Sequence, residues 1–346
     1  MFQLKDIGCL AELPRAVLTD GETPLQAMPN LARSIKGAPL WIKRDDLTPL
    51  AMGGNKVRQL EFYFGDALEK NADTVLITGA VQSNFVRLTA AAASKLGMNC
   101  HVQLEERVKK SDDNYRNSGN VLLDRLMGAT LHSYPHGEDE AGADANMELI
   151  ADQLRESGNK PYVIHLGGGY PSLGALGYVV CAIEVANQIR QQNISLRGIV
   201  VPSGSGATHA GFLYGMAVLG IQIPVIGACV RRDAAIQRVR IAQHCESISS
   251  LLKMQNPVTD DQIMLDDNQL APGYGQAGPG AMRAIRLAGS CEGLVVDPVY
   301  SSKALACALD RAKAESDSAG FLFLHTGGGP AIFAYQDEML RAIEGV

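Results

Sequence analysis

Short apolar runs alternate with longer amphipathic stretches along most of this chain. The apolar runs predict strands at residues 40–43, 74–78, 99–104, 129–132, 162–164, 196–201 and 224–230. The stretches between them predict helices, of which the clearest cover residues 85–96, 118–126 and 207–219. Strands that alternate with helices form βαβ units, and near-continuous apolar runs are typical of parallel strands covered on both faces. The pattern therefore predicts an α/β fold with mainly parallel sheets.

Two polar segments interrupt this alternation. Residues 105–115 and 135–143 are mostly charged or polar and poorly periodic, so we expect loops there. The triplet Gly167-Gly168-Gly169 is typical of a hinge or of a loop that approaches a ligand. We expect two α/β domains, a small one inserted into a larger one. The small domain covers residues 59–167, and the larger domain covers residues 1–58 and 168–346.

The bulk composition excludes several classes of protein. The chain has 346 residues, of which 46% are hydrophobic and 20% charged, as is usual for a globular protein. Its net charge is −6 and it has no long basic block, so nucleic acid is not an expected partner. It has no signal-peptide pattern and no apolar run of membrane-spanning length. Its seven cysteines are scattered singly, which disfavours a metal site and a disulfide framework and favours a cytoplasmic protein.

The segment Gly53-Gly54-Asn55-Lys56 places a lysine directly after a tight turn. Two glycines let the backbone turn sharply and approach a ligand closely. A lysine that is partly removed from water has a lowered pKa, and its neutral amine can form an imine with an aldehyde. Lys56 is therefore a candidate catalytic residue. The alternative is an ordinary surface lysine after a Gly-Gly turn.

A second candidate site lies between an apolar strand and a helix, and comprises Ser203, Gly204, Ser205, Gly206, Ala207 and Thr208. Small residues at a helix start let backbone N–H groups face an anion, and the helix dipole adds to the attraction, so a phosphate is the expected ligand. The segment lacks the lysine of a P-loop and the spacing of a Gly-x-Gly-x-x-Gly motif. A nucleoside triphosphate site and a dinucleotide-dependent oxidoreductase are therefore disfavoured. A strand-to-helix turn without a ligand is the alternative.

Hydroxyl and amide side chains accompany other turns. Ser83 and Asn84 stand between a predicted strand and a predicted helix, where an ordinary N-cap is the alternative to a binding site. Tyr274, Tyr300 and Thr326 each lie near turn-forming glycines or prolines towards the C-terminus. Tyrosines in such places are more often half-buried packing residues.

A reactive lysine combined with a phosphate cradle that has no P-loop lysine indicates a phosphorylated aldehyde. Pyridoxal 5'-phosphate is the common cofactor with both features, and it serves as an electron sink.

The chain also resembles the D-cysteine desulfhydrase and 1-aminocyclopropane-1-carboxylate deaminase family over nearly its whole length. The matching motifs occur in order at residues 42–46, 53–56, 82–84, 203–208, 273–275, 297–300 and 325–328. The resemblance implies the tryptophan-synthase-β-like fold of pyridoxal-phosphate enzymes, known as fold type II, usually as a homodimer.

The resemblance implies a role in cofactor binding for each candidate. Lys56 would hold the cofactor and also move the α-proton of the substrate. Asn84 would bond the ring hydroxyl of the cofactor, and the segment 203–208 would hold its phosphate. Thr326 would face the pyridine nitrogen. A hydroxyl group there, unlike a carboxylate, would not keep the nitrogen protonated, which suits β-elimination.

On the substrate side, the resemblance implies that Ser83 faces the substrate carboxylate. Tyr274 and Tyr300 would form a catalytic pair that positions the substrate or assists proton transfer. Two positions depart from the family pattern. Ser301 stands where the deaminases carry a glutamate, which argues against cyclopropane ring opening. Phe85 stands where the family usually has histidine or glutamine, so the pocket is expected to prefer a different substrate.

The implied reaction is pyridoxal-phosphate-dependent α,β-elimination from a small β-substituted amino acid, with D-cysteine giving pyruvate, sulfide and ammonia. Alternatives are an L-cysteate sulfo-lyase, a deaminase-like activity and a relative that binds the cofactor but turns over little. A sulfonate would need an additional cation, for which Arg87, Arg231 and Arg232 are candidates. Each of these arginines could instead be an ordinary solvated charge.

Overall fold

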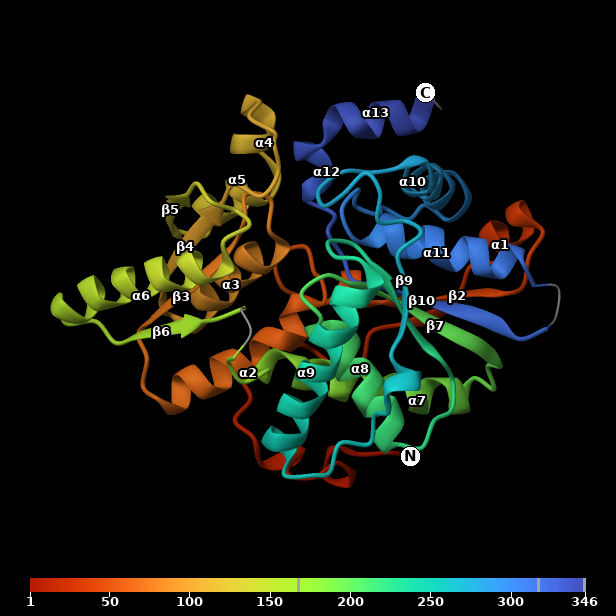
Figure 1. Ribbon diagram of the computed structural model, residues 1–346, viewed down its shortest axis with the longest axis horizontal. Coiled ribbons are helices and arrows are strands. Elements are labelled where there is room, and N and C mark those ends of the chain that lie inside the picture. The colour runs from red at the N-terminus through yellow and green to blue at the C-terminus, as the bar shows by residue number, and fades with distance from the viewer. Residues whose placement is uncertain (167–168, 316–317, 345–346) are drawn as a thin grey trace.

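The computed structural model describes residues 1–166, 169–315 and 318–344, which form two α/β units around two separate sheets (Figure 1). The larger sheet has six strands in the order β1-β2-β10-β7-β8-β9. Its neighbouring strands are parallel except for the pair β1 and β2. The strands are β1 (Leu25–Ala27), β2 (Leu40–Arg44), β7 (Leu196–Ser203), β8 (Val225–Cys229), β9 (Met264–Asp266) and β10 (Gly320–His325).

Helices cover both faces of this larger sheet (Figure 1). On β7, Ile199 belongs to the apolar core on one face and its neighbour Val200 to the core on the other face. Successive strand residues point to opposite faces, so a strand buried on both sides has to be apolar throughout. One face is covered by α7 (Leu176–Gln191), α8 (Ala207–Val218) and α9 (Ala234–Leu252), and the other by α1 (Pro29–Ile35), α10 (Pro279–Glu292) and α11 (Ser301–Lys313).

The smaller sheet has four parallel strands in the order β5-β4-β3-β6. They are β3 (Thr74–Ala80), β4 (Asn99–Glu105), β5 (Thr130–Tyr134) and β6 (Pro161–Ile164). Two helices, α2 (Lys56–Glu69) and α3 (Asn84–Leu96), share an apolar core with these strands. A third helix, α6 (Glu140–Glu156), contacts β3 and β6.

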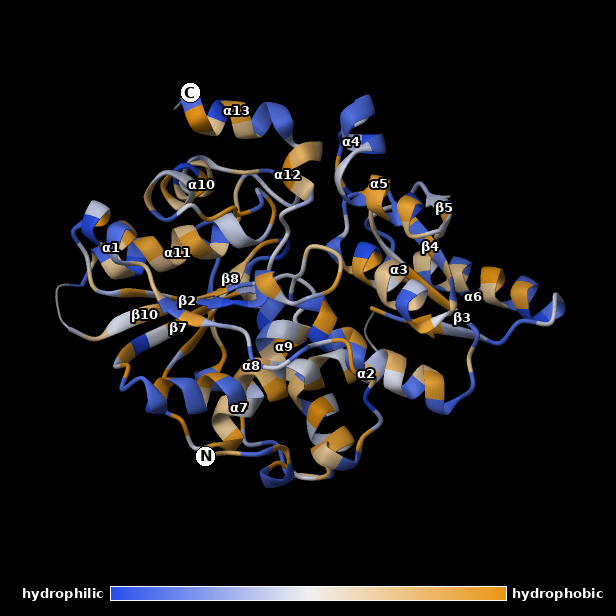
Figure 2. Cartoon of the chain, turned by 180° about the vertical axis from the view of Figure 1, so that it is seen from behind, coloured by the Kyte–Doolittle hydropathy of each residue, from blue (hydrophilic) through white to orange (hydrophobic). Residues whose placement is uncertain are grey.

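Shorter helices connect the two units. These are α4 (Asp113–Asn117), α5 (Gly119–Leu126), α12 (Ala331–Ala334) and α13 (Gln336–Glu344), and α12 contacts both α4 and α5. Hydrophobic and hydrophilic residues alternate along α6, α11 and α13, as expected for amphipathic helices (Figure 2). Within the described residues, no helix is both long and apolar enough to cross a membrane.

The two-sheet α/β architecture predicted from the hydrophobic pattern is confirmed, but the two expected loops are partly helical. Helix α4 begins at Asp113 and helix α6 at Glu140, inside the polar segments. Asp112 and Asp139 precede these helices, and the side chain of each accepts a hydrogen bond from a backbone N–H of the first turn. Charged residues in these segments therefore act as N-caps rather than as loop residues. Of the two expected domain boundaries, the one between residues 58 and 59 falls inside α2. The one after residue 167 lies outside the described residues, as does the Gly167-Gly168 part of the glycine triplet.

Candidate active site

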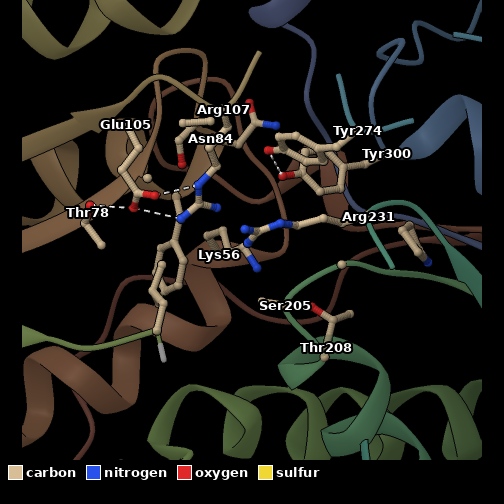
Figure 3. Close-up of a pocket in the computed structure, with 18 of the residues that line it drawn as sticks. Lys56, Thr78, Asn84, Glu105, Arg107, Ser205, Thr208, Arg231, Tyr274 and Tyr300 are labelled. Atoms are coloured by element: carbon tan, nitrogen blue, oxygen red, sulfur yellow. Dashed lines mark hydrogen bonds and ion pairs between the residues drawn. The ribbon is translucent and has the colours of Figure 1, made fainter. Parts of the chain in front are cut away.

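A cavity lies where the two sheets face each other, and residues that are far apart in the sequence converge on it (Figure 3). Its wall includes the carboxyl ends of β3 and β4, the segments after β7 and β10, and the turn before α2. Ligands of α/β proteins commonly bind beyond the carboxyl ends of parallel strands, where the sheet leaves a crevice. The predicted residues on this wall are Lys56, Ser83, Asn84, Gly204, Ser205, Gly206, Thr208, Tyr274, Tyr300 and Thr326.

The turn that leads into Lys56 has an uncommon backbone conformation. Four successive residues have positive φ angles, namely Ala51 at 41°, Met52 at 65°, Gly53 at 68° and Gly54 at 129°. A Cβ atom on Gly53 would lie 2.0 Å from the carbonyl oxygen of Asp46, so this position requires glycine. Ala51 and Met52 carry side chains in a region that costs conformational energy, so the surrounding structure has to hold the turn in place.

Arg87, on α3, is one of the residues that hold this turn. Its guanidinium donates hydrogen bonds of 2.8 Å to the carbonyl oxygens of Ala51 and Gly53. Arg87 is fully buried and does not line the cavity. The expectation that it could bind a sulfonate is therefore wrong, because its charge is committed to the backbone of the turn.

Asn55 ties the same turn to two other parts of the site. Its backbone N–H donates to the carbonyl oxygen of Thr326, at 3.1 Å, and its side-chain amide donates to the hydroxyl of Thr208, at 2.8 Å. Gln59, one turn further along α2, donates to the same hydroxyl at 2.8 Å. The lysine turn, the start of α8 and the end of β10 therefore form one hydrogen-bonded unit.

Lys56 is the first residue of α2, and its amine points into the cavity (Figure 3). The Nζ atom lies 3.3 Å from the side-chain oxygen of Gln59 and 4.8 Å from the centre of the Phe85 ring. Burial disfavours the charged ammonium and lowers the pKa of Lys56 to about 8. About a tenth of this amine is thus neutral, and nucleophilic, at pH 7, far more than for an ordinary lysine.

The predicted phosphate cradle opens into the same cavity at the N-terminus of α8. Gly206 has a φ angle of 101°, and a Cβ atom there would lie 2.7 Å from the His244 ring. The carbonyl oxygen of Ser205 is turned towards α9, where it lies 2.7 Å from Nε of Arg240 and 3.0 Å from Nε2 of His244. This arrangement leaves the first N–H groups of α8 available to an anion, as the sequence predicts.

Two residues of the predicted cradle, Ser203 and Ala207, do not line the cavity. The Ser203 hydroxyl accepts a hydrogen bond from Gln237 at 2.8 Å and lies 3.2 Å from Nδ1 of His209. These contacts hold the end of β7 against the neighbouring helices. Only the backbone of Ser203 and Ala207 could take part in binding at the cradle.

The start of α3 forms the wall opposite the cradle. Ser83 is the N-cap of this helix and accepts a hydrogen bond of 3.3 Å from the backbone of Val86. Asn84 accepts a hydrogen bond of 3.1 Å from Asn120. The N-cap interpretation of Ser83 is therefore correct. It is compatible with a binding role, because both side chains also line the cavity.

Tyr274 and Tyr300 meet at a further wall, with their hydroxyl oxygens 2.5 Å apart (Figure 3). The two rings pack edge to face, with centroids 5.9 Å apart. Burial raises the pKa of Tyr300, so its hydroxyl stays protonated near pH 7 and can donate a hydrogen bond. Thr326 follows β10 and is buried beside the Lys56 turn.

Ser301, which follows Tyr300, faces away from this cavity. It is fully buried, and its backbone N–H and its hydroxyl both donate to the carboxylate of Asp297. Asp297 also accepts hydrogen bonds from the backbones of Val299 and Tyr300, each of 2.9 Å. The segment is organised around Asp297, and position 301 offers no carboxylate to a ligand.

Several charged residues on the cavity wall were missed by the sequence analysis. Arg107 forms two hydrogen bonds to Glu105, of 2.7 and 2.8 Å, and Glu105 also accepts from the Thr78 hydroxyl at 2.6 Å. Burial lowers the pKa of Arg107, but the charge and hydrogen bonds of Glu105 outweigh burial and raise it. Glu105 ends β4, and the rule that strand carboxyl ends face the crevice would have selected it.

Glu140, at the start of α6, faces three arginines from the other unit. It pairs with Arg231 at 2.8 Å, with Arg240 at 3.4 Å and closely with Arg232. Burial raises the pKa of Glu140, but the charges of Arg240, Arg232 and Arg231 outweigh it and lower that pKa. Arg231 also pairs with Glu138, at 3.2 Å, so two carboxylates face three arginines and the cluster keeps surplus positive charge. Arg231 lines the cavity beside Tyr274.

These features suit a ligand that carries both a phosphate and an aldehyde. A helix N-terminus opens at one end of the cavity, and an amine with a lowered pKa stands in its wall. The family model described as pyridoxal-phosphate dependent enzyme matches residues 17–327. The chain therefore belongs to the family of pyridoxal-phosphate dependent enzymes.

Curated relatives and solved structures agree with this assignment. A D-cysteine desulfhydrase from Salmonella choleraesuis is 42% identical over 94% of this chain and 97% of its own length, and one from Salmonella newport is 41% identical over the same shares. The crystal structure of a 1-aminocyclopropane-1-carboxylate (ACC) deaminase homologue is 37% identical, with a TM-score of 0.85 over 96% of this chain and 97% of that one. Escherichia coli diaminopropionate ammonia lyase, at 17% identity and a TM-score of 0.63, shares the fold.

Proposed function

We propose that this protein is a pyridoxal-phosphate-dependent carbon–sulfur lyase that converts D-cysteine and water into pyruvate, hydrogen sulfide and ammonia. The observation that carries this proposal is the convergence of the Lys56 amine and the N-terminus of α8 on one cavity, with the tyrosine pair opposite. The D-cysteine desulfhydrases that are 41–42% identical over nearly the whole chain support the substrate.

The residues present fit the cofactor. Lys56 would hold its aldehyde carbon, the N–H groups at Gly204–Thr208 its phosphate, Asn84 its ring hydroxyl and Thr326 its pyridine nitrogen. Glycine at position 206 fits this role because its positive φ angle turns the chain into α8, at a place where a Cβ atom would meet the His244 ring. When bound, the cofactor withdraws electrons from the α-carbon of the amino acid and so makes its proton acidic.

The chain's own residues then supply binding and proton transfer. The hydroxyl of Ser83 and the N–H groups at the start of α3 are available to the substrate carboxylate. The Lys56 Nζ atom, once free, takes the α-proton as a general base, for which a pKa near the working pH is favourable. The Tyr300 hydroxyl, whose pKa burial raises, can donate a proton to the departing sulfur, and Tyr274 lies in hydrogen-bond contact with it.

The first test is a visible absorption spectrum of the purified protein, followed by pyruvate assays with D-cysteine and L-cysteine. We expect an absorption band of lysine-bound cofactor that Lys56→Ala abolishes, and pyruvate and sulfide from D-cysteine. Absence of the band after addition of pyridoxal phosphate would contradict the cofactor. A band without sulfide from either cysteine would contradict the substrate and leave the cofactor assignment intact.

A second candidate reaction is the elimination of sulfite from L-cysteate, favoured by the guanidinium groups of Arg107 and Arg231 on the cavity wall. A sulfonate needs a cationic partner, and a hydrogen bond to a charged group contributes ~1.5–3 kcal/mol. Arg231→Met should then lower kcat/KM for cysteate by roughly tenfold more than for D-cysteine. Equal losses for both substrates would remove this candidate. The buried Ser301 gives no support to a deaminase-like reaction.

We also infer that the enzyme is a cytoplasmic homodimer. The family resemblance supports the dimer, and the seven free cysteines, without a disulfide among the described residues, support a reducing compartment. Light scattering of the purified protein tests the dimer, and a mass of one chain, 36.9 kDa, would contradict it.

A further inference from the structure

The Lys56 amine rests against the face of an aromatic ring. Its Nζ atom lies 4.8 Å from the centre of the Phe85 ring, within the range of a cation–π interaction. Its other polar contact is the 3.3 Å hydrogen bond to the neutral amide oxygen of Gln59. Among the described residues, no carboxylate lies within ion-pair distance of Nζ. The ring is therefore one of two local groups that favour a positive charge on the amine, the other being the Gln59 amide.

The remaining ionisable groups around the cavity are occupied elsewhere. Arg107 is paired with Glu105, and Arg231 and Arg240 are paired with Glu140. Asp144 is paired with His165, the tyrosine hydroxyls bond each other, and His244 is hydrogen-bonded to Ser172 and to the Ser205 carbonyl. Within the described chain, the Phe85 ring face and the Gln59 amide are thus the direct contacts of the Lys56 amine that favour its charged form.

The ring is also fixed in position. Phe85 is the second residue of α3, is only 6% exposed, and belongs to the apolar core under the smaller sheet. It packs against the Tyr63 ring, with centroids 6.2 Å apart. A ring held by the core does not need to be ordered when the charge appears, so its attraction for the ammonium is preorganised.

We propose that Phe85 is a positioning residue for the base: its ring face holds the Lys56 amine in the cavity and favours the protonated over the neutral amine. Desolvation acts on the amine in the opposite direction, and the ring partly offsets it. The ring offers the amine a π face but no second hydrogen-bonding partner beside Gln59.

The consequence for catalysis rests on the proposed function. In the elimination, the proton that leaves the α-carbon of the substrate moves to Nζ of Lys56, and the electron pair of the broken C–H bond stays with the substrate. The charge on the amine exists only after this transfer. An interaction that favours the charged amine therefore stabilises the proton-transfer step selectively over the state before it.

The direct test measures the protonation of Lys56 in the cofactor-free protein. The rate of acylation of Lys56 by an amine-specific reagent is followed against pH, with the peptide resolved by mass spectrometry, in a buffer without phosphate or sulfate. A partly desolvated cation–π interaction contributes ~1–2 kcal/mol, and 1.36 kcal/mol corresponds to one pKa unit. Phe85→Leu should lower the midpoint of the pH profile by roughly 0.7–1.5 units.

Two further variants distinguish the effect of the Phe85 ring on the midpoint from an effect of altered core packing. Phe85→Tyr keeps a π face and should restore the midpoint of the parent protein. Tyr63→Leu removes the neighbouring ring of the same core but not the ring that faces the amine, so its midpoint should also match the parent. The proposal would be overturned if Phe85→Leu had the same midpoint as the parent protein. It would also be overturned if Tyr63→Leu shifted the midpoint as much as Phe85→Leu does. Circular dichroism confirms that each variant is folded.

The pH dependence of kcat for the loaded enzyme provides the second readout. If Lys56 is the base, the limb of the profile that reports its ionisation should move to lower pH in Phe85→Leu by the same amount as in the cofactor-free protein. If the loaded enzyme eliminates none of the tested amino acids, the proposed function fails, while the acylation profile still decides the role of Phe85. A shifted acylation profile with an unshifted kcat limb would overturn the catalytic consequence.

Discussion

Arg87 connects the strained turn before Lys56 to the helix that carries Ser83 and Asn84. It is fully buried, and its two hydrogen bonds reach the carbonyl oxygens of Ala51 and Gly53. Because Arg87 belongs to α3 and bonds the lysine turn, Lys56 and the residues at the start of α3 keep a fixed relation. Precise placement of this kind matters in an active site, where small displacements cost much of the rate.

Replacing Arg87 by methionine should lower the free energy of unfolding by ~2–4 kcal/mol, because two buried carbonyl groups lose charge-assisted partners. Arg87→Lys, which can keep one of the bonds, should show an intermediate loss. Urea unfolding followed by circular dichroism measures both. Lys95 lies exposed on the same helix, and Lys95→Met is the matched control, with an expected change within ~0.5 kcal/mol. If Arg87→Met lowered the free energy of unfolding no more than Lys95→Met does, Arg87 would not be holding the turn before Lys56.

The lowered pKa of Lys56 predicts how fast the cofactor attaches. Only the neutral amine attacks an aldehyde, and burial lowers the pKa of this amine from 10.5 to about 8. The rate at which the cofactor-free protein gains its visible absorption band should therefore rise with pH, with its midpoint near pH 8. A stopped-flow pH series measures this rate. A midpoint near that of an ordinary lysine, above pH 10, would show that the amine is not desolvated.

Helix α2, which begins at Lys56, is anchored by a buried ion network. Arg58 bonds Asp45 at 2.8 and 2.9 Å and Glu184 at 2.8 Å, and Lys43 pairs closely with Glu184. Burial raises the pKa of Asp45, but Arg58 and Lys43 outweigh it and lower that pKa to about 2. The motif at residues 42–46, which supports the family resemblance, thus contributes to the site through the placement of α2.

Removal of Arg58 should be costly, because it leaves the buried Asp45 carboxylate without its ion-pair partner, while Glu184 keeps only Lys43. Arg58→Met is expected to reduce the free energy of unfolding by ~3–5 kcal/mol. Lys70→Met provides the comparison on the same helix, since it breaks an exposed pair with Asp66 and should cost less than ~1 kcal/mol. Denaturant unfolding of both variants is the measurement. Similar losses for the two would show that the network does not anchor the helix.

The two units of the molecule are joined across the cavity by Glu140, which lies at the start of α6 and pairs with Arg231, Arg232 and Arg240. This cluster lies at the cavity, whose wall includes Glu140, Arg231 and Arg240. We propose that the chain divides into a small domain of residues 59–167 and a larger domain formed by the remainder. In that division, the Glu140 cluster is an ion-pair contact between domains.

Glu140→Gln should weaken this contact without unfolding either unit. The expected result is faster hydrogen exchange at the first turn of α6 and around Arg231, by roughly tenfold for each ~1.4 kcal/mol lost. Asp152→Asn on the same helix is the control, because Asp152 is exposed and pairs with Arg155 within α6. Hydrogen exchange with mass spectrometry compares the variants. Unchanged exchange at both segments in Glu140→Gln would contradict the contact.

Several features of this protein could be predicted from the sequence because each depends only on which residues are neighbours along the chain. The run at residues 196–201 is apolar throughout, and β7 is buried on both faces as that pattern requires. The two glycines before Lys56 both have positive φ angles, as expected for a tight turn. Only the last residues of the two polar segments were mispredicted as loops, since Asp112 and Asp139 act as caps only once the following residues are helical.

The sequence by itself determined the α/β alternation, the lysine turn and the small-residue cradle, because each depends on residue type at neighbouring positions. Only the tertiary structure decided which charged groups share the cavity. Arg87 and Arg231 are equally plausible ligands in the sequence, yet the fold buries the first against backbone carbonyls and directs the second to the cavity wall. Likewise, the contact of Phe85 with the Lys56 amine joins two different helices. Such contacts depend on how helices and strands pack against one another. The residues next to each other in the sequence do not determine the distance between two such elements.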